Sequence, residues 1–182
     1  MTNTFLIADT HFGHHGVCQF LRDDGTKLRP WTSYEEMDEA LVTNWNAVVK
    51  PADKVYLLGD VVINRRALPT IGRCNGRKVL IKGNHDIFKL NDYAPYFSDI
   101  RGYHVLNQMI LSHIPIHESS LGRFGANIHG HLHHRRVMKG SVIDPRYISV
   151  SVELIDYTPI SFDVINTQVT QQKELKGMAD AV

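Results

Sequence analysis

The sequence predicts an α/β or α+β layered domain, mainly because of the order of its apolar segments. Short apolar runs at residues 5–8, 54–58 and 78–82 are typical of buried strands. A helical pattern follows each of the first two runs, and mostly strand-like segments follow the third. The resulting order is β-α-β-α-β and then further strands, which favours helices packed on a sheet.

The first predicted helix has a clear start and a clear end. Ser33 and Glu36 have the spacing of a capping box, and apolar residues recur every three or four positions until Pro51. The second helical segment covers residues 66–73 and is shorter. An Asn-Gly pair after it predicts a turn into the third strand.

The second half of the chain is predicted to be mostly strands. They cover residues 103–106 and 109–112 as a hairpin around Asn107-Gln108, residues 126–129, residues 147–155, and an edge strand over 157–165. Residues 166–182 are polar and are predicted to be a tail or a peripheral helix. We therefore expect one domain over residues 1–165, without internal repeats, and a polar C-terminal tail over 166–182.

Length and composition agree with a single domain and do not indicate a particular binding partner. The chain has 182 residues, 43% hydrophobic and 21% charged, with a formal net charge of +1. This charge gives no broad footprint for duplex nucleic acid or an anionic membrane, and it leaves the oligomeric state open. Two cysteines make no disulfide framework, and the N-terminus lacks a signal-peptide pattern. We predict a cytoplasmic protein that is not inserted in a membrane.

Histidine is the compositional exception, with eleven copies. Several histidines and acidic residues lie just beyond predicted strand ends, at Asp9, Asp60, Asn84, His113 and His131. Ligands bind at the carboxyl ends of the strands in such sheets, so these residues are expected to converge on one rim.

Each motif at this rim also has an ordinary structural explanation. Alternation along an extended segment suffices for Asp9-Thr10-His11, and Asp60 after glycine is common turn chemistry. Residues 83–86 could form a polar turn, and 130–133 could form another. The hypothesis of a site therefore rests on all the motifs occurring in order in one small chain.

Taken together, the motifs resemble those of the calcineurin-like metallophosphoesterase superfamily. They are Asp9-x-His11, Gly59-Asp60, Gly83-Asn84-His85-Asp86, His113 and Gly130-His131-x-His133. The similarity runs from about Thr4 to Pro159 and points to small single-domain bacterial and phage members. The resemblance implies a layered sandwich of two mixed β-sheets flanked by helices, with a dinuclear metal site at the strand C-terminal ends.

The resemblance also implies the metal ligands. They are Asp9, His11 and His133 for the first ion, Asn84, His113 and His131 for the second, and Asp60 as a bridge between both. Imidazole and carboxylate ligands suit two divalent ions such as Mn, Fe, Zn, Ni or Co, and the set does not decide among them. The lack of a thiolate excludes a structural cysteine-type zinc site.

The activity implied is hydrolysis of phosphodiesters, phosphomonoesters or both, on small or nucleotide-type substrates. Two ions roughly 3.5–4 Å apart can share a hydroxide, lower its pKa towards about 7, and stabilise an in-line displacement at phosphorus. In the family pattern His85 faces the phosphoryl group as a catalytic residue, and Asp86 is predicted to orient its ring. The alternatives are a single-strand nuclease and a catalytically inactive scaffold of the same fold.

Substrate contacts are less specific. His14, His117 and Arg65 are candidates, each with a solvated or loop role as the alternative. The same alternative holds for the other arginines near the rim, which are Arg22, Arg29, Arg66 and Arg123. The chain departs from the family in having Ile63 where many members carry a second acidic residue, which puts support and substrate contacts there in doubt.

The histidine-rich stretch 127–136, "NIHGHLHHRR", carries two of the predicted ligands. An extended backbone would place His129, His131 and His133 on one face and His134 on the other. The resemblance selects His131 and His133, which makes His129 a strand or supporting residue. His134 is expected on a solvated edge.

Overall fold

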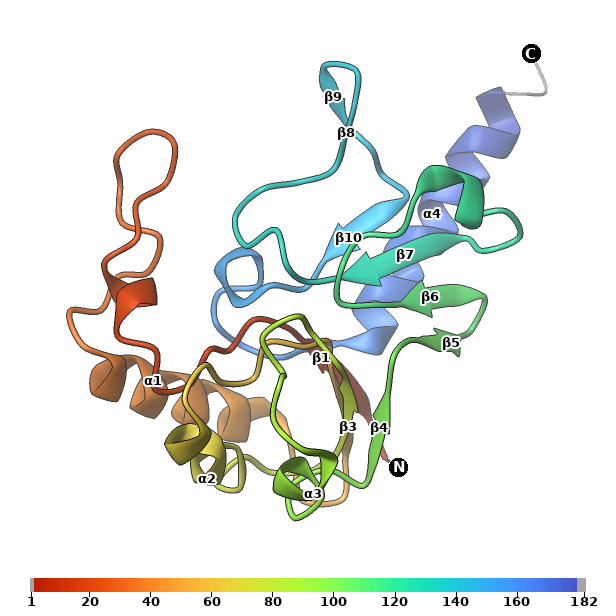
Figure 1. The fold of residues 1–182 in the computed structure, drawn as a ribbon. Helices are drawn as coiled ribbons and strands as arrows, with labels where there is room; N and C mark the ends of the chain where they lie inside the picture. The colour runs from red at the N-terminus through yellow and green to blue at the C-terminus, as the bar shows by residue number, and fades with distance from the viewer. Residues whose placement is uncertain (1, 180–182) are drawn as a thin grey trace.

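The computed structural model describes residues 2–179 and contains two mixed β-sheets with helices around them (Figure 1). The strands are β1 Thr4–Ile7, β2 Lys54–Leu57, β3 Arg77–Ile81, β4 Asp99–Arg101, β5 His104–Leu106, β6 Met109–Leu111, β7 Ala126–His129, β8 Met138–Lys139, β9 Val142–Ile143, β10 Tyr147–Ser149 and β11 Ile160–Ser161. The helices are α1 Tyr34–Val48, α2 Leu68–Ile71, α3 Leu90–Tyr93 and α4 Phe162–Ala179, with 3-10 turns at Gly16–Cys18, Arg65–Ala67, Glu118–Ser120 and Val152–Leu154. The predicted α/β architecture with two mixed sheets is confirmed.

The sheets bring the carboxyl ends of several strands to one edge. The first has the order β11-β1-β2-β3-β4 and the second the order β10-β7-β6-β5; β11 and β5 are antiparallel to their neighbours and the other pairs are parallel. A parallel bridge between Ala8 and Ser151 joins the sheets just past β1 and β10. The loops after the parallel strands therefore meet at this edge.

Alternation along the strands builds two cores. Phe5 and Ile7 of β1 contact the core that includes Met37, Leu41 and Trp45 of α1. The intervening side chains, such as Leu6, belong to a second core shared with residues of β6, β7 and β10. Because both faces of the first sheet are covered, its strands are apolar runs rather than alternating ones.

The helix α1 begins close to where the capping pattern predicts. Ser33 is the N-cap, and its side chain accepts a hydrogen bond from the Glu36 amide at 3.2 Å. The Glu36 carboxylate accepts from the amide of Thr32, one residue before the position that a full capping box would use. None of the helices in the described part of the chain combines the length and apolar composition needed to cross a bilayer.

The predicted hairpin is confirmed as β5 and β6. Asn107 and Gln108 form its turn and have positive φ angles of 46° and 59°. Two consecutive residues with positive φ are the mark of a two-residue hairpin loop whose twist matches that of its strands.

The long strand predicted over residues 147–155 is wrong beyond Ser149. The chain leaves β7 there and forms the 3-10 turn Val152–Leu154. Ser151 is held by its hydroxyl, which donates to Asp9 Oδ2 at 2.7 Å. The alternating pattern was misleading because its polar members face a buried polar site and not solvent.

The edge strand predicted over 157–165 is reduced to the two residues of β11. Ser161 ends it by accepting a hydrogen bond from the Asp163 amide, and α4 begins at Phe162. Ile165 and Val169 of α4 are buried in the core between the sheets. Residues 166–179, predicted as part of a tail or a peripheral helix, therefore continue α4, and residues 180–182 lie outside the described part of the chain.

Candidate metal centre

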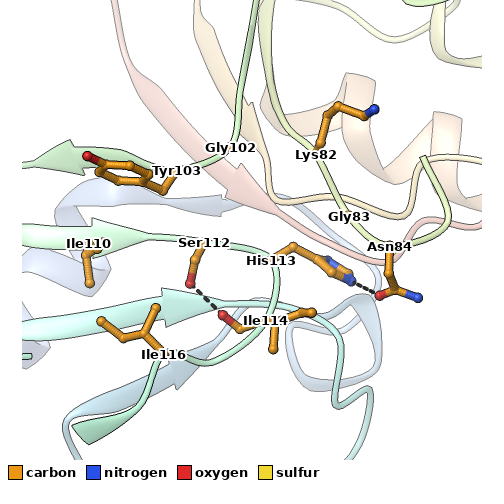
Figure 2. A pocket seen from close by; sticks show the side chains of 10 residues that line it. All are labelled: Lys82, Gly83, Asn84, Gly102, Tyr103, Ile110, Ser112, His113, Ile114 and Ile116. Carbon is orange, nitrogen blue, oxygen red and sulfur yellow. Dashed lines mark hydrogen bonds between the residues drawn. The ribbon is translucent and has the colours of Figure 1, made fainter. Parts of the chain in front are cut away.

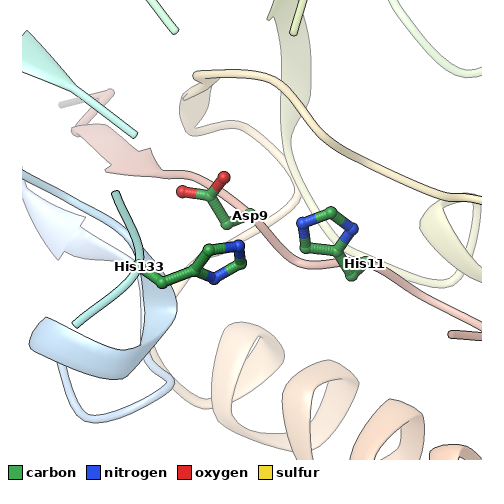
Figure 3. A group of neighbouring side chains, drawn as sticks. All are labelled: Asp9, His11 and His133. Carbon is green, nitrogen blue, oxygen red and sulfur yellow. The ribbon is translucent and has the colours of Figure 1, made fainter. Parts of the chain in front are cut away.

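Two groups of potential metal ligands lie at the edge where the strands end. They are Asp9, His11 and His133 in the first group and Asp60, His113 and His131 in the second; within each group the potential ligand atoms lie within 4.8 Å of one another. Figure 3 shows the first group, with its carboxylate and two imidazoles gathered from different segments. These are the same two sets that the sequence predicts, apart from Asn84.

Asp60 lies between the groups. Its Oδ2 atom is 3.3 Å from His113 Nε2 in its own group and 3.7 Å from His11 Nε2 in the first group. Asn84 completes the second side, with its Oδ1 atom 2.9 Å from His113 Nε2. The fold therefore brings all seven predicted ligand positions to one place.

The backbone at the candidate ligands is unusual. Positive φ angles occur at Asp9, His11, Asp60, His131 and His133, with values from 49° to 71°. Non-glycine residues adopt this region at a free-energy cost, and such residues concentrate at functional sites. An extended backbone therefore does not continue through His131 and His133, because each of these two residues sits in a tight turn.

Glycines precede Asp60, Asn84 and His131 because the loops are packed against each other. A Cβ atom at Gly130 would lie 2.6 Å from Ala8 Cβ and 2.7 Å from Asp9 Oδ2. A Cβ atom at Gly83 would overlap the Asp60 carboxylate. The glycine in the Gly83-Asn84 and Gly130-His131 motifs is thus required by close approach of neighbouring chains.

His133 is held by Glu153, a buried residue for which the sequence predicted no role at the site. Its Nδ1 atom is 3.0 Å from Glu153 Oε1, and Glu153 also pairs with Arg29 at 2.8 Å. Burial opposes ionisation of Glu153, but Arg29 and His133 outweigh it and lower the pKa of Glu153 to about 2. The fixed carboxylate leaves His133 Nε2 directed at the centre.

Arg29 is not a substrate contact. It is fully buried, and besides Glu153 its guanidinium donates to the carbonyl oxygens of Asp9 and Thr10 at 2.5 and 2.9 Å. It therefore supports the backbone of the Asp9-x-His11 turn.

His113 is oriented by the backbone of a neighbouring strand end. Its Nδ1 atom is 2.8 Å from the carbonyl oxygen of Leu58, which can only accept, so Nδ1 carries a proton. Three atoms with lone pairs then lie close together: His113 Nε2, Asn84 Oδ1 and Asp60 Oδ2. Burial lowers the pKa of His113, but the Asp60 carboxylate outweighs it and the net shift is upward, so without a cation a proton is favoured at this point.

The Asp9 carboxylate is fully buried. It accepts hydrogen bonds from the His131 amide at 2.9 Å and the Ser151 hydroxyl at 2.7 Å. Desolvation nevertheless raises its pKa to about 6, against the lowering effect of His133 and His113. A carboxylate that is costly to keep ionised without a counter-charge is suited to a cation ligand.

The raised pKa of Asp9 predicts how the stability of the metal-free protein depends on pH. The folded protein binds this proton more tightly than the unfolded chain, so in metal-free protein the contribution of Asp9 to stability is lost as the pH rises from about 4 to about 6. We expect Asp9→Asn to raise the free energy of unfolding of metal-free protein at pH 7.5 by about 1–3 kcal/mol, and to leave it nearly unchanged at pH 4. Urea unfolding with a chelator at both pH values measures the difference. An equal loss of stability at both values would contradict the burial argument.

The predicted catalytic and substrate residues divide into two groups. His85 and His14 lie at the site, with ring centroids 5.7 and 5.5 Å from that of His11. His117 instead caps the turn Glu118–Ser120, where it accepts from the Ser119 amide. Arg65 pairs with the Asp92 carboxylate on the surface. The structure thus gives both of these residues other partners, and of the three candidates it places His14 beside the ligand groups.

Asp86 is at the site but in a different role from the predicted one. Its carboxylate accepts from the backbone amides of Asp60, Val61 and Gly83 at 2.8 to 3.0 Å. Both oxygens take part in these bonds, and no hydrogen bond joins Asp86 to the His85 ring among the described residues. Asp86 fixes the turn that carries His85, whose amide donates to Asp60 Oδ1 at 2.9 Å.

The other histidines of the stretch 127–136 are structural. His129 is buried in β7, and its Nδ1 atom is 2.8 Å from the carbonyl oxygen of Gly130. His134 was expected on a solvated edge, but it is half-buried beside Asp23, with 18% of its side chain exposed. Asp23 also pairs with Arg135, so the loop around Asp23 covers this edge.

Fold and ligand groups together define an α/β protein with a carboxylate- and imidazole-lined candidate metal site at one sheet edge. No protein-family model matches the chain. The sequence is 33% identical to uncharacterized protein MJ1445 of Methanocaldococcus jannaschii over 190 residues, covering 99% of this chain and 98% of that protein. The chain therefore belongs to the MJ1445 family.

Two further similarities accompany this one. The chain is 37% identical over 93 residues to the Gene 66 protein of Mycobacterium phage L5, which covers 47% of this chain and 41% of the phage protein. The fold is similar to the crystal structure of AQ665, a protein of unknown function from Aquifex aeolicus, with a TM-score of 0.68, 26% identity and coverage of 92% and 99% of the two chains.

Proposed function

We propose that the protein is a metal-dependent phosphoesterase that hydrolyses phosphodiesters, phosphomonoesters or both. The observation that carries the proposal is the position of Asp60 between two ligand groups, each with two imidazoles. A carboxylate shared by two such groups is the arrangement expected of a two-metal hydrolytic site.

The donor set fits divalent cations. The groups offer carboxylate, amide and imidazole atoms, which suit Mn, Fe, Co, Ni or Zn. The buried Nδ1 atom of His11 has no hydrogen-bond partner among the described residues. Burial and the Arg29 charge hold the pKa of His11 well below its usual range, so its imidazole is neutral and able to bind a cation.

Each side chain then has a part in the reaction. Asp9, His11 and His133 would hold one cation, Asn84, His113 and His131 the other, and Asp60 would bridge them. The cations would supply Lewis acidity and positive charge for in-line displacement at phosphorus. His85, exposed beside Asp60, can face the phosphoryl group and donate a proton to the leaving oxygen, while Asp86 holds its turn in place.

Hydrolysis of bis(p-nitrophenyl) phosphate and of p-nitrophenyl phosphate tests the proposal. We expect nitrophenol release that depends on an added divalent cation and stops with a chelator. No release of nitrophenol from either ester with any of Mn, Fe, Co, Ni or Zn would refute the proposed activity.

The Glu153–His133 contact predicts an effect on metal binding itself. We expect Glu153→Gln to weaken binding of one cation by about 10- to 100-fold, because the carboxylate orients the ring of His133. Calorimetric titration of metal-free protein with Mn or Zn measures the affinity. Glu39→Gln is the matched control, because Glu39 pairs with Arg73 on the surface at 2.6 Å. Equal affinities in both variants would remove Glu153 from the support of the site.

A further inference from the structure

A cleft of about 460 Å³ lies beside the second ligand group. Asn84 and His113 are among the residues that line it, so one end belongs to the candidate metal centre. Figure 2 shows the cleft between the segment that carries Tyr103 and the segment that carries Ile114 and Ile116. Its volume is in the range of small-molecule sites.

The cleft also carries exposed apolar side chains. Tyr103, between β4 and β5, is 63% exposed, and Ile114, just after β6, is 51% exposed. Ile110 on β6 also lines the cleft and is buried. Large apolar side chains left open on both sides of a cleft, next to a polar centre, indicate a place for an apolar part of a ligand.

The polar side chains of the cleft leave its apolar part free for an apolar group. The Ser112 hydroxyl donates to the Ile114 carbonyl oxygen at 2.8 Å and is therefore already used. Lys82 is the one lysine, arginine or acidic residue among those that line this cleft in the described part of the chain. Figure 2 shows its side chain directed away from Tyr103 and Ile114. The space between those two side chains thus suits an uncharged group.

We propose that this cleft binds a planar ring on the organic group of the phosphoester, with the ring against Tyr103 and Ile114 and the phosphate at the His113 and Asn84 end. The inference rests on the proposed phosphoesterase function and narrows it to phosphodiesters of aryl alcohols or nucleosides. Tyr103 and Ile114 are then determinants of specificity. Stacking on an aromatic side chain accepts any base or aryl ring, because each has a π-face.

Two diesters with the same leaving group test this subsite: p-nitrophenyl phenyl phosphate and p-nitrophenyl methyl phosphate. In each, a water oxygen bonds to phosphorus, the bond from phosphorus to the nitrophenyl oxygen breaks, and a water proton passes to the leaving oxygen or solvent. We expect the phenyl-to-methyl ratio of kcat/KM to fall by about tenfold in Tyr103→Ala, and to be kept in Tyr103→Phe. Val142→Ala is the control, because Val142 is 62% exposed on β9 and does not line the cleft.

A binding measurement separates the subsite from the activity. In NMR spectra of adenosine 5′-monophosphate with metal-free protein, we expect broadening of the base proton signals, and its loss in Tyr103→Ala. Hydrolysis of both diesters with a ratio unchanged by Tyr103→Ala would overturn the subsite and leave the phosphoesterase proposal standing. If no metal supports hydrolysis but the base proton signals still broaden in a way that depends on Tyr103, the proposed function is overturned and the ring site stands. Absence of both the preference and the broadening would refute the ring site.

Discussion

Asp60→Asn is expected to lower kcat for bis(p-nitrophenyl) phosphate by about 10³-fold or more, because a bridging charge worth several kcal/mol is removed. Asp60 faces both ligand groups, at 3.3 and 3.7 Å from a histidine of each. The amide has the same shape, and its oxygen can still accept the His85 amide at the Oδ1 position. The loss should therefore come from the charge and not from the fold.

Steady-state kinetics and calorimetric metal titration together check this result. We expect the variant to bind fewer than two cations at concentrations that saturate the unaltered protein. Asp163→Asn, on an exposed position of α4, is the control and should match the unaltered protein in both measurements. Full activity in Asp60→Asn would exclude a two-metal site bridged by this residue.

His85→Ala is expected to lower kcat by about 10²- to 10⁴-fold while metal binding is kept, because a proton donor is lost and no ligand is. The His85 side chain is exposed. Its hydrogen bond to Asp60 comes from the backbone amide. Alanine retains that amide. The side chain can therefore be removed without disturbing the turn that Asp86 holds.

The effect should be larger for poor leaving groups than for nitrophenolate, which needs little protonation. Comparing bis(p-nitrophenyl) phosphate with an alkyl ester tests this directly. His15→Ala is the control, since His15 is exposed and contacts Gln19 at 2.8 Å. Equal sensitivity for both leaving groups would argue that His85 stabilises charge on the phosphoryl oxygens and donates no proton.

Strand positions and candidate ligands could be predicted from the sequence for one physical reason. Parallel strands buried on both faces are apolar runs, and the polar residues at their carboxyl ends stand out against them. Asp9, Asp60 and Asn84 each follow such a run, so their convergence could be predicted from strand order alone.

The supporting residues could not be predicted because their partners are remote in the chain. Glu153 looks like the solvent-facing member of an alternating strand, yet it is buried against Arg29, which lies 124 positions earlier. The same remoteness hides the role of Asp86, because two of the backbone amides that donate to its carboxylate lie 25 and 26 positions away. One available signal was the pair of serines before Glu153, because Ser149 and Ser151 are small polar residues in an otherwise apolar strand.

Hydrogen bonds between segments remote in the chain also predict an order of folding. Asp9 is bonded to Ser151 and to the His131 amide, across separations of 142 and 122 residues. Contacts of such long range form late, because the loops that they close cost the most entropy. We therefore expect the first ligand group to be complete only after β10 has docked beside β7. During refolding, recovery of tight cation binding should mark the final step of folding, and the cation should act by slowing unfolding more than by speeding folding.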